Sequence, residues 1–298
     1  MTKPAILFGP TAVGKTALSV ELAKQFNGEI ISADSMQVYR HMDIGTAKPS
    51  KEQRSLVPHH LIDVVDPDES WTVSDFIERT NVLIKELSSK GKLPLIVGGT
   101  GLYLNALING YSFPIAAKDD AIRKRLEKLD VKEIYGRLKA ADPDAAEKIS
   151  SNDRKRMIRA LEVFEQTGIP ITKLQKKKEN KNLKLICLNT EREKLYERIN
   201  QRVDGMIKDG LVDEVKGLLE KGYTKSLQSM QALGYKEVIG YLNDEYGHDE
   251  MVELIKRKTR NFARRQLTWF KRFPNVRWIE SGDIATSGYQ GIRDILEL

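Results

Sequence analysis

The stretch from Ala5 to Gln25, AILFGPTAVGKTALSVELAKQ, decides the fold. It opens with an apolar run typical of a buried strand, Ala5–Phe8, and closes with a helical pattern over Ala17–Gln25. Between them, Gly9–Thr16 (GPTAVGKT) matches G-x-x-x-x-G-K-[ST] in the strand, turn and helix setting that this motif requires. The sequence therefore predicts a phosphate-binding loop at the start of an α/β domain.

The residue types of this loop suit a diphosphate. Its glycines let the backbone curl until N–H groups point inward, and the N-terminus of the following helix adds partial positive charge. We expect Lys15 to reach two phosphates and Thr16 to hold Mg²⁺, which is the one cofactor that the motif implies. The predicted diphosphate site consists of Gly9, Pro10, Thr11, Ala12, Val13, Gly14, Lys15 and Thr16.

Further apolar runs rich in β-branched residues follow along the chain, most of them separated by helix-length segments. These runs are Glu29–Ser32, Leu61–Val65, Leu93–Val97, Leu183–Leu188 and Val276–Ile279. The alternation predicts an α/β fold, with a parallel sheet flanked by helices. After Leu188 the pattern is helical at Glu191–Lys208, Val212–Lys221, Ser229–Leu242 and Glu250–Phe273.

The segment 112–182 contains no strand candidate and shows helical patterns at Ala121–Leu129 and Arg154–Gln166. We therefore predict two domains: an α/β core made of residues 1–111 and 183–298, and an all-helical insertion made of residues 112–182. The net charge is 49 − 42 = +7, and the stretch from Lys118 to Lys181 carries most of it. A polyanionic partner is plausible on this basis, although charge alone does not distinguish a nucleic acid from a phosphorylated substrate.

Composition excludes several classes of protein. The 298 residues are 40% hydrophobic and 31% charged, which is ordinary globular composition. No apolar run is as long as a membrane span and the first residues do not resemble a signal peptide, so we expect a cytoplasmic protein without membrane contact. The single cysteine, Cys187, lies in an apolar run and excludes an internal disulfide and a Cys-rich zinc site. A monomer is the default expectation.

The carboxylate that usually accompanies a phosphate-binding loop is missing. Nucleotide hydrolases and kinases pair the loop with an aspartate at the end of a second strand, but Leu93–Val97 leads into Gly98–Tyr103 (GGTGLY). A carboxylate follows another strand, in Asp34–Tyr39 (DSMQVY). Because strand ends on the loop side face the ligand, Asp34 is a candidate general base or metal-linked group; the alternative is an aspartate that caps a loop.

Two other features leave alternatives open. The adjacent His59 and His60 point to opposite sides of an extended chain, so a hydrogen-bonding or structural role is favoured over joint metal binding. The run Lys256–Arg272 holds eight basic residues and no acidic one, interleaved with aromatic residues. It predicts a helix with either a phosphate-binding face or a solvated face.

Taken together, an ordered set of motifs resembles the tRNA dimethylallyltransferase family, also called the isopentenyltransferases. The motifs are GPTAVGKT, DSMQVY, GTAKP at Gly45–Pro49, PHHLID at Pro58–Asp63, VGGTGLYL at Val97–Leu104, KRMIRALEV at Lys155–Val163, QALGYKE at Gln231–Glu237 and RRQLTWF at Arg264–Phe270. They span nearly the whole chain in order. A phosphate-binding loop alone would be shared with many unrelated enzymes, whereas this ordered set is specific.

The resemblance implies transfer of a dimethylallyl group from dimethylallyl diphosphate to N6 of the adenosine directly 3′ of the anticodon, in tRNAs that read codons beginning with U. It implies that the loop holds a leaving diphosphate, so no water has to be activated. By the family pattern, Asp34 is the base, and Lys15, Thr16 and Arg202 hold the diphosphate.

The resemblance also implies the contacts with RNA. Asp34, Ser35, Met36, Gln37 and Thr100 match family positions beside the target adenosine. A second group, on a helix of the insertion, matches a segment that contacts the anticodon stem-loop and consists of Lys155, Arg156, Met157, Ile158 and Arg159. The adenosine must leave its stack to reach a buried diphosphate.

Two other functions fit the loop by itself. A small-molecule kinase would use the same loop for ATP and a basic helical lid, and would transfer phosphate without RNA. A non-catalytic RNA-binding ATPase would bind RNA without any prenyl transfer.

Overall fold

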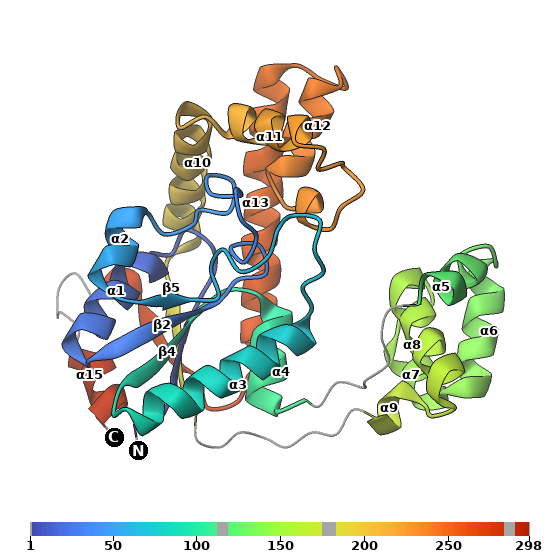
Figure 1. Ribbon diagram of the computed structural model, residues 1–298, viewed down its shortest axis with the longest axis horizontal. Coiled ribbons are helices and arrows are strands. Elements are labelled where there is room, and N and C mark those ends of the chain that lie inside the picture. Colours follow the sequence, from blue (N-terminus) through green and yellow to red (C-terminus); the bar gives the residue numbers. More distant parts are fainter. Residues whose placement is uncertain (1, 112–118, 175–182, 283–289, 298) are drawn as a thin grey trace. The chain divides into compact units, whose positions relative to one another are not determined.

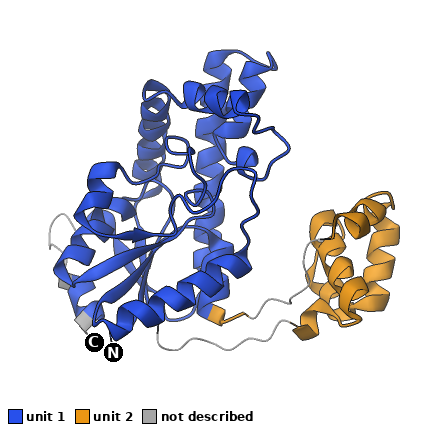
Figure 2. Cartoon of the chain, in the orientation of Figure 1, with its two compact units in different colours: residues 1–108, 181–298 blue, residues 109–180 orange. Residues whose placement is uncertain are grey.

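The computed structural model describes residues 2–111, 119–174, 183–282 and 290–297. The chain forms two compact units, residues 1–108 with 181–298 and residues 109–180 (Figure 2). These boundaries lie close to those expected from the sequence. We refer to them as the core unit and the helical unit.

The core unit contains one parallel sheet of six strands in the order β3-β2-β4-β1-β5-β6, which confirms the α/β class (Figure 1). The strands are β1 (Ala5–Phe8), β2 (Gly28–Ala33), β3 (His59–His60), β4 (Leu93–Gly98), β5 (Lys184–Asn189) and β6 (Arg277–Glu280). In the register, Gly98 of β4 lies opposite both Phe8 of β1 and Ala33 of β2. The loops that follow these three strands therefore leave the sheet side by side at its carboxyl edge.

Successive residues of β1 bury into opposite faces of the sheet, as the two-residue period of a strand requires. Ile6 and Phe8 join one hydrophobic cluster, and Ala5 and Leu7 join the other. The helices of this unit are α1 (Lys15–Gln25), α2 (Lys51–Leu56), α3 (Val73–Ser89), α4 (Gly101–Asn109), α10 (Arg192–Lys208), α11 (Leu211–Glu220), α12 (Tyr235–Leu242), α13 (His248–Phe270) and α15 (Gln290–Glu297). Cys187 is fully buried in β5, as predicted.

The helical unit is built from short helices around a core of its own. They are α5 (Asp120–Leu126), α6 (Val131–Ala141), α7 (Pro143–Lys148), α8 (Arg154–Thr167) and α9 (Ile171–Leu174). Aspartates at Asp119, Asp130, Asp142 and Asp153 cap four of them, each accepting backbone N–H groups of the first turn. Within its described residues this unit has no strand.

Two sequence predictions were wrong. The strand expected at Leu61–Val65 is displaced to His59–His60, because Leu61 and Asp63 have left-handed φ angles of 60° and 56°, which no strand tolerates. The helix expected over Ser229–Leu242 is interrupted between a short 3₁₀ turn and α12, and Gly234 has a φ of 93° at the break.

In the part of the chain that the structure describes, no helix has both the length and the apolar character to cross a bilayer. The monomeric state and the cytoplasmic location stay predictions.

Candidate active site

The phosphate-binding loop connects β1 to α1 and has the backbone that its glycines permit. Gly14 adopts a φ of 103°, which L side chains rarely reach, directly before the first residue of α1. A Cβ at Gly9 would lie 2.6 Å from the carbonyl oxygen of Leu188 in β5, so the loop requires a glycine there as well. No side chain caps α1, which leaves the N–H groups of its first turn directed toward a ligand.

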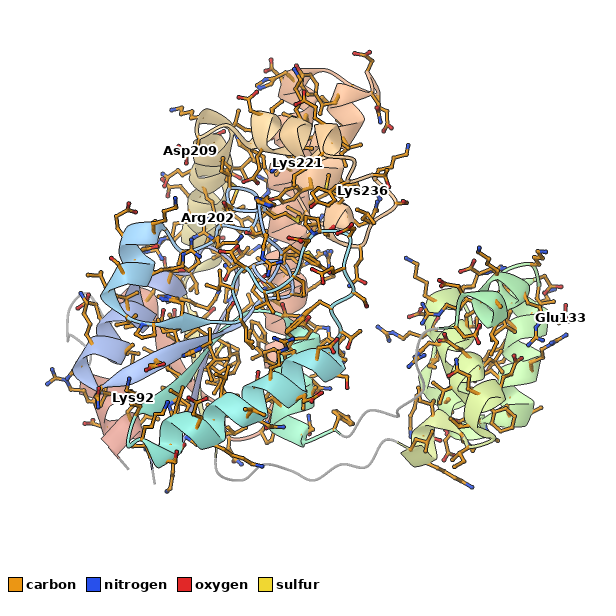
Figure 3. The ribbon with its side chains drawn as sticks, in the orientation of Figure 1. Lys92, Glu133, Arg202, Asp209, Lys221 and Lys236 are labelled. Atoms are coloured by element: carbon orange, nitrogen blue, oxygen red, sulfur yellow. The ribbon has the colours of Figure 1, made fainter. Side chains whose placement is uncertain are left out.

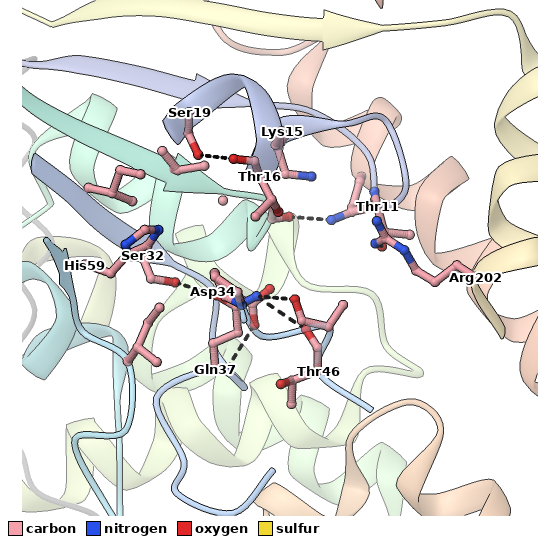
Figure 4. Close-up of a pocket in the computed structure, with 18 of the residues that line it drawn as sticks. Thr11, Lys15, Thr16, Ser19, Ser32, Asp34, Gln37, Thr46, His59 and Arg202 are labelled. Atoms are coloured by element: carbon pink, nitrogen blue, oxygen red, sulfur yellow. Dashed lines mark hydrogen bonds between the residues drawn. The ribbon is translucent and has the colours of Figure 1, made fainter. Parts of the chain in front are cut away.

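Two cations converge on this loop (Figure 4). The Lys15 Nζ donates to the carbonyl oxygens of Gly9 and Pro10 at 2.9 and 2.8 Å, which leaves one of its three N–H donors for a ligand. Arg202 reaches in from α10 and donates from Nη1 to the Thr11 hydroxyl at 3.3 Å (Figure 3). Burial, followed by the charge of Arg202, lowers the pKa of Lys15 to about 8, and burial also lowers the pKa of Arg202. An anion bound in this loop would reduce the repulsion between the Lys15 and Arg202 side chains.

Asp34 begins the loop after β2, and its two carboxylate oxygens differ in their contacts. Its Oδ1 accepts the backbone N–H groups of Met36 and Gln37 at 2.8 and 3.3 Å, so it does cap the loop. Its Oδ2 accepts no hydrogen bond from any described residue, and Asp34 lines the pocket beside the phosphate-binding loop. Burial raises the pKa of Asp34, although these N–H groups and Lys15 oppose the rise. A carboxylate with raised basicity and a free oxygen is suited to accept a proton.

The other residues predicted around Asp34 mostly shape the loops. Ser35 donates its backbone N–H to the Thr100 hydroxyl at 3.0 Å, which ties the loop after β2 to the loop after β4. Gln37 accepts the Ser32 hydroxyl at 3.0 Å and donates to the carbonyl oxygens of Thr46 and Ala47 at 3.4 and 3.3 Å. Met36 lines the apolar side of the site.

The site consists of two adjoining pockets. The first is polar and contains Lys15, Thr16 and Ser32; the second is mainly apolar and contains Met36, Met206 and Leu233. The residues that line both pockets are Thr11, Asp34, Thr46, Ala47, Arg202 and Phe262. A ligand that spans both pockets therefore passes Asp34 and Arg202.

The donor set fits a magnesium ion that keeps several ligands from water and substrate. Mg²⁺ in phosphate sites is held by one or two protein oxygens together with phosphate oxygens. The Thr16 hydroxyl borders the polar pocket and has no hydrogen-bond partner among the described residues. No group of three or more His, Cys, Asp or Glu side chains in the described ranges is arranged to bind a metal.

The two histidines make separate hydrogen bonds, as predicted. His60 Nε2 contacts a Glu29 carboxylate oxygen at 2.6 Å, and His59 Nδ1 contacts the carbonyl oxygen of Val57 at 2.8 Å. Since burial lowers the pKa of His59, its ring is neutral near pH 7 and donates from Nδ1. The buried Nε2 atom is then an acceptor without a partner among the described residues, in a residue that lines the polar pocket.

A third loop, which contains Gly45, Thr46 and Ala47, contributes to the lining of both pockets. The sequence gives little indication of the contacts that fix its position. Glu214 of α11 accepts the backbone N–H groups of Asp43, Ile44 and Gly45 at 2.8, 2.8 and 3.2 Å. Tyr235 of α12 donates its hydroxyl to the same carboxylate. A Cβ at Gly45 would lie 2.3 Å from the Tyr235 ring, which explains the glycine of the GTAKP motif. Glu214 itself lies in an ordinary amphipathic helix and has no sequence signature.

The predicted RNA-binding residues on α8 divide between surface and core. Lys155 and Arg156 are exposed. Met157 and Ile158 are buried in the helical unit, and Arg159 pairs with the buried carboxylate of Glu162 at 2.7 Å. The side chains of Met157 and Ile158 therefore pack the core and do not face a ligand, which corrects the prediction for these two.

The basic stretch of α13 is also divided. Lys256 and Lys258 form ion pairs with Asp204 and Glu237 at 2.8 and 2.7 Å, so they stabilise the core unit. Arg264, Arg265, Lys271 and Arg272 are exposed.

Comparisons with known proteins show the family of the chain. Residues 37–273 match a family model described as IPP transferase, and residues 3–63 match a second model described as isopentenyl transferase. The tRNA dimethylallyltransferase of Thermotoga neapolitana is 51% identical over 280 residues, which cover 93% of this chain and 92% of the relative. This chain belongs to the tRNA dimethylallyltransferase (IPP transferase) family.

Two solved structures extend the likeness of this tRNA dimethylallyltransferase family member to the fold. A tRNA isopentenylpyrophosphate transferase from Bacillus halodurans has a TM-score of 0.75 and 43% identity, covering 100% of this chain and 97% of its own. A eukaryotic dimethylallyltransferase acting on tRNA has a TM-score of 0.84 and 30% identity, covering 99% of this chain and 78% of its own.

Proposed function

We propose that this protein transfers the dimethylallyl group of dimethylallyl diphosphate to N6 of the adenosine directly 3′ of the anticodon, in tRNAs that read codons beginning with U. One observation carries the proposal: Asp34, whose Oδ2 accepts no hydrogen bond from a described residue, lines the same pocket as Lys15 and Thr16 of the phosphate-binding loop. A base and a leaving-group site are thus adjacent, as transfer of an allyl group from a diphosphate oxygen to an adenine nitrogen requires. The family of the chain supports the same reaction.

The chemistry follows from the charges. The C1–O bond of the allylic diphosphate breaks with its electron pair on oxygen, and the adenine N6 lone pair forms the new bond to C1. Lys15, Arg202 and the N–H groups from Gly14 onward stabilise the departing anion, which is where negative charge grows. A Mg²⁺ ion on the Thr16 hydroxyl supplies further positive charge when bound. The N6 proton passes to Oδ2 of Asp34.

The RNA is bound by both units in this proposal. In the core unit, the loop of Ser35, Met36 and Gln37 and the side chain of Thr100 surround the extruded adenosine, next to the mainly apolar pocket. In the helical unit, the exposed Lys155 and Arg156 contact phosphates of the anticodon stem-loop.

A kinase is not favoured. In kinases with this loop, metal and hydroxyl are positioned by an aspartate at a neighbouring strand end. Here β4, which pairs with β1, ends at Gly98 and continues into Gly99 and Thr100.

The deciding experiment incubates the protein with Mg²⁺, labelled dimethylallyl diphosphate and unmodified tRNA. We expect label on the RNA and a five-carbon unit on the adenosine by mass spectrometry. ATP turnover with no label on the RNA, or a phosphate group on the product, would show that the proposal is wrong. A tRNA with guanosine at the target position is the matched control.

A further inference from the structure

Gln266 of α13 joins two loops of the site through one buried amide. Its side-chain Oε1 accepts the backbone N–H of Thr11 at 2.9 Å, and its Nε2 donates to the carbonyl oxygen of Gly99 at 2.8 Å. The side chain is 5% exposed, so neither bond competes freely with water. A Cβ at Gly99 would lie 2.4 Å from Nε2, which explains why the loop after β4 has glycine there.

The contacts continue from Gly99 to the base. Thr100 donates its backbone N–H to the carbonyl oxygen of Ala33 at 3.3 Å, at the end of β2. Its hydroxyl accepts the N–H of Ser35 at 3.0 Å, and Ser35 directly follows Asp34. An unbroken series of hydrogen bonds and covalent bonds therefore runs from Thr11 in the diphosphate loop to the Asp34 carboxylate.

Packing fixes the position of α13 against the same loop. Trp269 lies almost one helical turn beyond Gln266, and a Cβ at Gly101 would lie 3.1 Å from its ring. The other end of the series is fixed as well, because Arg202 donates to the Thr11 hydroxyl while Gln266 accepts the Thr11 N–H. The Thr11 amide is thus committed to Gln266 and is not one of the anion-binding groups.

We propose that Gln266 is a positioning residue, which sets the separation between the leaving-group loop and the Asp34 base. The inference rests on the proposed function and deepens it. It assigns a role in the reaction to a residue of α13 that does not itself contact the reacting atoms. Misplacement by about 1 Å can reduce a rate by roughly 10²-fold. Loss of the amide is therefore expected to reduce kcat much more than substrate affinity.

The test compares Gln266→Met, Gln266→Glu and the exposed Gln228→Met in the full-length chain. Methionine keeps the length and removes both hydrogen bonds; glutamate keeps an acceptor for Thr11 and removes the donor to Gly99. We expect both Gln266 variants to lose roughly 10- to 100-fold in kcat. Their KM for tRNA and their Kd for inorganic diphosphate should stay within about threefold of the Gln228 control.

A double-mutant cycle with Thr100→Val separates positioning from simple destabilisation. If Gln266 acts through Gly99 and Thr100, the double variant should be little slower than the slower single variant. A multiplicative loss, or a kcat equal to that of Gln228→Met, would overturn the inference. Failure of the proposed function gives a different result, since the unaltered protein would then prenylate no tRNA at all. The glutamate variant keeps the test decisive if the methionine variant does not fold.

Discussion

Replacing Asp34 by asparagine separates its proposed role as a base from its role in the loop. Asparagine keeps an Oδ1 acceptor for the N–H groups of Met36 and Gln37, so the loop that surrounds the adenosine should persist. Only the basic Oδ2 is lost. General-base catalysis contributes roughly 10²–10⁴-fold, which corresponds to about 3–5 kcal/mol of transition-state stabilisation. We therefore expect kcat to fall by that factor while the Kd for tRNA changes by less than about threefold.

Alanine at the same position should do more damage. It also removes the acceptor for two backbone N–H groups, and each unsatisfied donor costs about 1–3 kcal/mol when buried. The loop should then loosen, and the KM for tRNA should rise in addition to the fall in kcat. The difference between the alanine and asparagine variants measures the structural role of Asp34, and the asparagine variant alone measures the chemical role.

The assays are steady-state prenylation of an unmodified anticodon stem-loop, which gives kcat and KM, and filter binding of the same RNA, which gives Kd. The pH profile gives a second readout. Because burial raises the pKa of Asp34, the carboxylate is protonated and inactive below that value, and kcat should fall at a higher pH than for an ordinary aspartate. This acid limb should be absent from the residual activity of Asp34→Asn. Turnover within tenfold of the unaltered protein, or an unchanged acid limb, would refute Asp34 as the base.

Three further outcomes follow from the same geometry. Affinity for inorganic diphosphate, measured by isothermal titration, should weaken as pH rises through about 8, where Lys15 loses its proton, by up to roughly tenfold per pH unit. The Lys15→Arg variant binds the same titrating ligand, but its affinity should lack the loss that comes from Lys15. Replacing Lys155 and Arg156 by glutamine should weaken tRNA binding and leave the diphosphate Kd unchanged. The slope of log Kd against log salt concentration should fall by about 0.7–0.9 for each phosphate that these side chains no longer neutralise. An unchanged slope would exclude α8 from the RNA interface. The variant Glu214→Gln places an amide N–H₂ among the backbone N–H groups that the carboxylate accepts. It should therefore lower the free energy of unfolding, measured by urea titration, by about 1–3 kcal/mol and raise the KM for tRNA. Stability equal to that of the exposed Glu220→Gln variant would contradict this.

Local patterns predicted the parts of the fold that local forces determine. The strand, loop and helix around GPTAVGKT are fixed by short-range requirements: apolar residues for a buried strand, glycine at Gly14 for a left-handed φ, and free N–H groups at the start of α1. The edge strand was misplaced for the opposite reason. Leu61–Val65 has the composition of a strand, but its backbone turns at Leu61 and Asp63, where the Asp63 carboxylate accepts from the buried Lys48 and from Arg54. Tertiary contacts overrode the propensity.

The candidate site shows the same limit. Lys15 could be found because it belongs to the glycine-rich motif between β1 and α1, and Asp34 because it directly follows β2, a position that the chain order reveals. Gln266 and Glu214 act through hydrogen bonds to backbone groups more than a hundred residues away in the chain. The only trace of them in the sequence is indirect: Gly99 and Gly45 are glycines because an amide and a phenol ring, each on a distant helix, occupy the space of a Cβ.

The position of the carboxylate explains how a loop typical of nucleotide enzymes can serve a reaction at carbon. In phosphoryl transfer the reacting atom is a phosphorus held inside the phosphate-binding loop. The groups that align the metal and the nucleophile must therefore lie next to that loop. In transfer from an allylic diphosphate the reacting atom is the carbon bonded to a diphosphate oxygen, which lies farther from the loop than the phosphorus atoms. The base is therefore expected beside the phosphate-binding loop, at the side where this carbon lies. Asp34 occupies that place, since it lines both the polar pocket with Lys15 and the mainly apolar pocket with Met36. A carboxylate moved to the end of β4, for example by Gly98→Asp, would place a second negative charge near the diphosphate. It would also put a Cβ 2.3 Å from the carbonyl oxygen of Ala33, so this variant should lose diphosphate affinity without gaining ATP turnover.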